Sequence, residues 1–75
     1  MTLTEYAQEI KALERGEYPA TMQTLGWSLS DAADFLASEL GRIAWQPWAR
    51  AEAAQLIGRC LAVRNKAWQR EYNLR

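Results

Sequence analysis

The sequence predicts an all-α fold, a small three-helix domain in which two short helices precede one long C-terminal helix. Apolar residues recur every three or four positions over three stretches of the chain, which is the period of an amphipathic helix. The two prolines, Pro19 and Pro47, fall between these stretches, where a proline ends one helix or begins the next. The chain has 75 residues, of which 49% are hydrophobic and 24% charged. This length and composition predict a single helical domain over residues 1–75.

The first helix is predicted over residues 2–15. Its apolar residues share one side of a helix and are Leu3, Tyr6, Ala7, Ile10 and Leu13. Thr2 or Thr4 can cap its first turn, and Gly16 offers the left-handed conformation that commonly ends a helix. The pattern therefore defines both ends of this helix as well as its buried face.

Residues 16–28 connect this helix to the next, with room for a single helical turn between Ala20 and Leu25. Their number is large for a connection in a helical bundle, where about 2–8 residues are usual. The connection is also unusually apolar, with the larger side chains Tyr18, Met22, Leu25 and Trp27. We expect it to pack over the helices; the alternative is that it presents these side chains to a partner.

The second and third helices are predicted over residues 29–44 and 47–72. Ser28 or Ser30 can cap the second helix, whose apolar row is Leu29, Ala32, Ala33, Leu36, Leu40 and Ile43. Pro47 is expected at the first position of the third helix, because the N–H that proline lacks has no helical partner there. The core row of the third helix is Ala49, Ala53, Leu56, Cys60, Val63 and Ala67.

The composition argues against most catalytic and metal sites. The chain has no histidine, so it lacks the side chain that acid–base catalysis and metal binding use most often. The one cysteine, Cys60, cannot form an intramolecular disulfide. It sits in an apolar run, where a thiol is expected to be buried and unreactive. We therefore expect no enzymatic activity, no metal and no cofactor.

The sequence also predicts a cytoplasmic protein that does not associate with a membrane. The N-terminus lacks the basic segment followed by an apolar segment that marks a secretory signal. No stretch approaches the roughly 18 uninterrupted apolar residues that a membrane-spanning helix needs. A single cysteine is typical of a reducing compartment.

The charges cancel overall but are unevenly placed along the chain. Residues 1–27 and 28–47 each carry a net charge of −2, and residues 48–75 carry +4. A basic third helix packed against two acidic helices explains this segregation without a partner. The alternative is that Arg59, Lys66 and Arg70, which share one side of the third helix, form a basic stripe that contacts phosphates or an acidic protein surface.

The third helix is too long to be covered by the two shorter ones. Its distal end is expected to remain uncovered near Val63, Ala67, Trp68 and Tyr72. A second copy of the chain is the simplest cover for this apolar surface. We therefore expect the third helix to pair through these four residues with a second copy of the chain, as a homodimer; the alternative is that it pairs with a different protein.

The four tryptophans are the most unusual feature of the composition. Trp27, Trp45 and Trp48 lie at predicted helix boundaries, where a side chain is often only half covered. Tryptophan is enriched in binding hot spots because it offers a large apolar area with little loss of rotamer freedom. With Tyr18, these three residues are the candidate partner-binding residues; the alternative is that they close the ends of the bundle.

Together these patterns predict a non-catalytic protein that binds a larger protein stoichiometrically, as an inhibitor or an adaptor. Small, neutral helical chains of this kind are common among the accessory proteins of bacteria and their phages, although a fold alone does not specify a function. Two alternatives remain. The chain can be a regulator that contacts nucleic acid through the basic stripe, or a subunit that assembles only with itself.

Overall fold

The computed structural model describes residues 1–73, with side chains up to residue 70. The described residues form three α-helices, α1 (Leu3–Glu14), α2 (Leu29–Ile43) and α3 (Arg50–Asn73), and a short 3-10 helix, η1 (Ala20–Met22). No β-strand occurs among residues 1–73. The all-α fold with two short helices and one long C-terminal helix is therefore confirmed.

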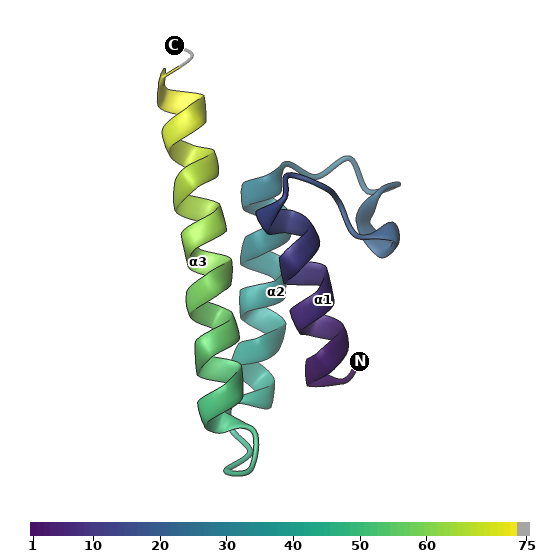
Figure 1. Cartoon of the computed structure of the whole chain (residues 1–75), viewed down its shortest axis with the longest axis vertical. Helices are drawn as coiled ribbons and strands as arrows, with labels where there is room; N and C mark the ends of the chain where they lie inside the picture. Colours follow the sequence, from purple (N-terminus) through teal and green to yellow (C-terminus); the bar gives the residue numbers. More distant parts are fainter. Residues whose placement is uncertain (74–75) are drawn as a thin grey trace.

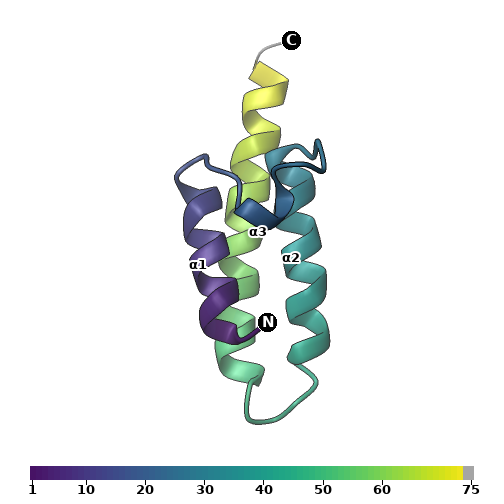
Figure 2. The same cartoon turned by 90° about the vertical axis from the view of Figure 1, so that its right-hand side faces the viewer.

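The three helices run up, down and up, so that α1 and α3 point in the same direction and α2 runs against both (Figures 1 and 2). The most extensive packing is between α2 and α3, and α1 lies against this pair. The molecule is elongated, with principal extents of 43 × 23 × 17 Å. At one end α3 projects beyond both shorter helices, and at the other end a short loop joins α2 to α3 (Figure 2).

Side-chain caps define the N-terminal ends of the two short helices. The Thr2 hydroxyl accepts a hydrogen bond from the Glu5 N–H at 3.2 Å, and the Glu5 carboxylate accepts one from the Thr2 N–H at 3.2 Å. The Ser28 hydroxyl likewise accepts from the Asp31 N–H at 3.2 Å. Gly16 has a φ of 78°, the left-handed conformation expected at the end of α1. Local sequence signals thus narrow each N-terminal cap to two residues, of which the structure uses Thr2 and Ser28.

The core consists of the apolar rows that face the centre of the bundle. Ile10 and Leu13 come from α1, and they meet a set of buried side chains from the other helices, namely Ala32, Ala33, Leu36, Leu40, Leu56, Cys60 and Val63. The predicted rows of α2 and α3 supply most of this core. Helical periodicity was therefore a sound guide to which face of each helix is buried.

The connection from residue 16 to residue 28 packs over the helices, as expected. Met22 is buried in the core, and η1 occupies the predicted single helical turn. Trp27 is half-buried, and its ring meets that of Phe35 edge to face, with centroids 5.0 Å apart. Leu25 is the exception, because half of its surface remains exposed.

The start of α3 differs from the prediction. The helix begins at Arg50 rather than at Pro47. Pro47 instead lies in a tight turn in which the Ala49 N–H donates to the Gln46 carbonyl at 3.0 Å. Both a helix start and the second position of a β-turn require the φ angle that proline imposes, so the residue type alone does not decide between them.

Candidate functional site

The turn between α2 and α3 places two tryptophans at one end of the molecule. We call residues 44–49 the tryptophan tip. The Gln46 N–H donates to the Ile43 carbonyl at 3.0 Å, which puts Trp45 at the corner of one hydrogen-bonded turn. The bond from Ala49 to Gln46 puts Trp48 at the corner of the next turn. The backbone of the tip therefore directs both indoles outward.

These two indoles are the most exposed large apolar side chains among the described residues. Trp45 is 83% exposed and Trp48 is 76% exposed. Covering either one would remove on the order of 150–200 Å² of apolar surface from water, equivalent to about 4 kcal/mol before the cost of association. Neither residue belongs to the core cluster. The tip thus carries a large surface that the fold itself does not use.

The tip is held in place at both of its ends. Ala49 is fully buried, and the Ala44 N–H continues the hydrogen bonding of α2 by donating to the Leu40 carbonyl at 2.9 Å. The Arg50 side chain crosses the turn and donates from Nε to the Ala44 carbonyl at 3.3 Å. Pro47 adds a fixed φ angle. A partner would therefore meet two indoles whose backbone is already ordered.

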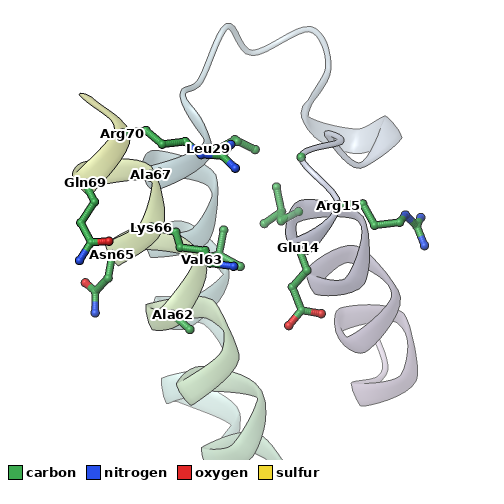
Figure 3. Close-up of a pocket in the computed structure, with 12 residues that line it drawn as sticks. Glu14, Arg15, Leu29, Ala62, Val63, Asn65, Lys66, Ala67, Gln69 and Arg70 are labelled. Atoms are coloured by element: carbon green, nitrogen blue, oxygen red, sulfur yellow. The ribbon is translucent and has the colours of Figure 1, made fainter. Parts of the chain in front are cut away.

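A second surface feature lies at the opposite end, where α3 continues past the end of α1. A groove of about 490 Å³ runs between the C-terminal end of α1, the first turn of α2 and the distal part of α3 (Figure 3). We call it the overhang groove. Its apolar lining residues are Leu13, Leu29, Ala62, Val63 and Ala67. Its polar lining comprises Glu14, Arg15, Asn65, Lys66, Gln69 and Arg70.

The charged side chains around the overhang groove differ in whether they point into it. Figure 3 shows the Lys66 and Arg70 side chains extending from α3 toward the groove, whereas Arg15 points away from α3. Arg15 also pairs with Glu17 at 3.4 Å, and both of these side chains are more than half exposed. The cations that face the groove are therefore Lys66 and Arg70.

The carboxylate of Glu14, beside the groove, forms an ion pair with Arg59. Arg59 donates to both of its oxygens, with distances of 2.6 Å from Nη2 to Oε1 and 3.2 Å from Nε to Oε2. This bidentate pair lowers the pKa of Glu14 and raises that of Arg59. Arg64 makes a similar contact between α3 and α2, with 3.0 Å from Nη1 to Oδ1 of Asp34. The basic third helix thus pairs with the two acidic helices, as the internal explanation of the charge segregation predicted.

The predicted basic stripe is consequently divided. The Arg59 guanidinium forms an ion pair with Glu14, whereas Lys66 and Arg70 face the overhang groove. The groove also includes Leu13 and Leu29, which the sequence placed in the apolar rows of the first two helices and not among the candidate site residues. The excess length of the third helix predicted an uncovered region here, but not which residues of the other helices border it.

The predicted partner-binding residues do not form one site. Trp45 and Trp48 lie together on the tip, whereas Tyr18 and Trp27 belong to the first connection, at the other end of the bundle (Figure 1). Tyr18 is half-buried, and Trp27 is held against Phe35. The four residues therefore cannot contact one small surface together.

The predicted self-association residues also occupy different environments. Val63 is only 8% exposed and belongs to this chain's own core, which corrects the expectation that it is uncovered. Leu13 and Leu29 line the same groove as Val63. Ala67 is half-buried in the groove. Trp68 is 44% exposed, and the Arg64 guanidinium lies over its ring, 4.6 Å from the ring centroid. The side chain of Tyr72 lies outside the described residues.

Cys60 lies in the apolar core of the bundle. Cys60 is fully buried, and burial raises the pKa of its thiol to about 11. No group of three potential metal-ligating side chains is found in the described part of the chain. Among the same residues, no helix is both long enough and apolar enough to cross a lipid bilayer.

Comparison with known proteins gives no relative from which a role can be transferred. No protein-family model matches the chain, and no curated protein or solved structure is significantly similar to it. Any functional assignment therefore depends on the two surface features themselves.

Proposed function

We propose that this chain is a non-catalytic binding protein that attaches to a larger protein through the tryptophan tip. The observation that carries this proposal is the exposure of Trp45 and Trp48 on a turn closed by backbone hydrogen bonds. Tryptophan is among the residues enriched at the hot spots of protein interfaces, where it fills a desolvated pocket of the partner. Because the backbone that presents them is already ordered, binding loses less conformational entropy than it would with a flexible loop.

The chemistry of the chain supports a stoichiometric role, as an inhibitor or an adaptor. Its thiol is buried and poorly ionised at neutral pH. The most strongly paired charged groups, Arg59 with Glu14 and Arg64 with Asp34, join the helices to one another. We place the interaction in the cytoplasm, where an unpaired cysteine stays reduced.

The structure favours the tip over the two alternative functions. Nucleic-acid binding through the basic stripe is less favoured, because one of its three cationic side chains, Arg59, already pairs with Glu14. For self-assembly through distal α3, Trp68 remains an exposed aromatic side chain, but Val63 is buried in the core and is not available for contact with a second copy. Self-association remains a prediction, which sedimentation of the pure protein at tens of micromolar would test.

Site-specific photo-crosslinking tests the proposal. The photoreactive amino acid benzoylphenylalanine replaces Trp48 in one variant and the exposed Thr24, in the first connection, in a control variant. Both are irradiated in the cells that produce the protein. We expect a discrete adduct with a different protein from position 48, and none from position 24. The adduct should also fade when Trp45→Ala is added, because the two indoles act together.

Two outcomes would contradict the proposal. One is an adduct at position 48 that contains only a second copy of this chain. The other is crosslinking to lipid, together with a shift of tryptophan emission when the pure protein meets phosphatidylglycerol vesicles. That result would identify the tip as a membrane-interface anchor, since tryptophan also favours that environment.

A further inference from the structure

We propose that the overhang groove is a second binding site and that it takes an acidic amphipathic helix from another protein. The site lies at the end of the molecule opposite the tryptophan tip (Figures 2 and 3). The inference does not depend on the tip, and it gives the chain two separate binding surfaces, as an adaptor requires.

The form of the groove suits a helix lying alongside α3. The lining residues of α3 run from Ala62 to Arg70, which is about two helical turns or roughly 12 Å. Two of them, Ala62 and Ala67, are small enough to allow another helix to approach closely. Leu29, half-buried in the first turn of α2, supplies a larger apolar side chain, whereas Leu13 and Val63 are buried beneath the groove. An apolar row on a docked helix would find contacts from α2 and α3.

The charges of the groove specify the polar side of that ligand. Lys66 and Arg70 are four residues apart, so they sit one above the other on α3 at a spacing of about 6 Å. The carboxylate of Glu14, beside the groove, already accepts hydrogen bonds from Arg59 on both of its oxygens. A docked helix with two carboxylates one turn apart would match the two cations.

A second copy of this chain does not meet these requirements. Its acidic helices, α1 and α2, bury their apolar rows in their own core, as Ile10 and Leu40 show. Its distal α3 carries the same cations and would repel Lys66 and Arg70 if the two faces met. A nucleic acid also fits less well, because a phosphate backbone gains nothing from an apolar floor. The occupant that fits is therefore an acidic helix of a different protein.

Binding of designed peptides tests this inference. The probe is a fluorescein-labelled peptide of about 18 residues with leucines on one face and glutamates on the other, long enough for several turns. A matched peptide carries lysine in place of every glutamate, and a single-stranded oligonucleotide supplies phosphates without an apolar face. Fluorescence anisotropy with the full chain at low ionic strength should show saturable binding of the glutamate peptide only.

Charge reversal then locates the site. Lys66→Glu should weaken binding of the glutamate peptide about tenfold, and Arg70→Glu should act similarly. Arg42→Glu is the matched control, because it makes the same charge change at an exposed position near the tip. It should leave the affinity within about twofold. Trp45→Ala/Trp48→Ala should also leave it unchanged, so that failure at one site is distinguished from failure at the other.

The inference is overturned if the glutamate peptide does not bind, or if the lysine peptide binds equally well. It is also overturned if the oligonucleotide binds more tightly than the glutamate peptide, which would assign the groove to nucleic acid. An equal loss from Arg42→Glu and Lys66→Glu would mean that overall charge, and not the groove, governs the interaction.

Discussion

The two ends of α3 both leave apolar surface open to solvent, but for different physical reasons. At the tryptophan tip, a pair of hydrogen-bonded turns directs Trp45 and Trp48 outward. At the overhang groove, α3 continues past the end of α1, so that α1 does not cover the small apolar residues and cations of distal α3. The first arrangement suits a pocket on a partner, and the second suits a helix lying lengthwise. Exposed apolar surface is therefore informative only once its backbone setting is known.

The packed middle of the bundle is the reference for both ends, and a core truncation there should have the largest effect. Leu40 is fully buried between the helices. We expect Leu40→Ala to lower the free energy of unfolding by about 2–5 kcal/mol, because it removes buried methyl groups and leaves a cavity. Urea denaturation followed by circular dichroism measures this loss. A loss below about 1 kcal/mol would mean that the middle is no better packed than the ends.

A smaller effect is expected from Arg64, which links the overhanging half of α3 to α2. Its guanidinium bonds to Asp34 and covers the ring of Trp68. We expect Arg64→Ala to cost about 1 kcal/mol, because Asp34 is partly exposed and regains water when the pair is lost. The same denaturation experiment serves here, and Arg42→Ala, at an exposed position near the tip, is the control. If the two substitutions lowered the free energy of unfolding equally, the contacts of Arg64 with Asp34 and Trp68 would contribute nothing to stability.

The pair of Glu14 and Arg59 should make stability depend on pH. The pKa of Glu14 is lower in the folded chain than in the unfolded chain, chiefly because it accepts hydrogen bonds from Arg59. Its contribution is thus fully present above the unfolded pKa and is lost as the pH falls through the folded pKa. Glu14→Gln should therefore reduce stability at pH 7 and have less effect in acid. Equal effects at both pH values would show that the pairing contributes nothing.

Much of the fold follows from the sequence because periodicity and caps are local properties. Thr2 and Ser28, each one of two candidate caps, cap the two short helices, and the predicted rows supply the core. The start of α3 was predicted wrongly because Pro47 is equally compatible with a β-turn and a helix start. The turn is closed by contacts that local rules do not report, such as that from Arg50 to the Ala44 carbonyl.

The sites were harder to predict than the helices. Three tryptophans lie at helix boundaries, yet only Trp45 and Trp48 are largely exposed, because Trp27 packs against Phe35. That contact depends on how the first connection folds back over α2, which periodicity does not describe. Similarly, the segregation of charge was evident in the sequence, but the pairing of Arg59 with Glu14 depends on the level at which α1 ends along α3.

The smallest effect on stability provides the most direct test of the central claim, that the tip indoles are not needed by the fold. The measurement is the free energy of unfolding of Trp45→Ala/Trp48→Ala beside that of the unaltered chain. We expect the two values to agree within about 0.5 kcal/mol, as for other exposed positions. A loss of about 2 kcal/mol or more, comparable to a core truncation, would show that the indoles close the bundle and are not a surface for a partner.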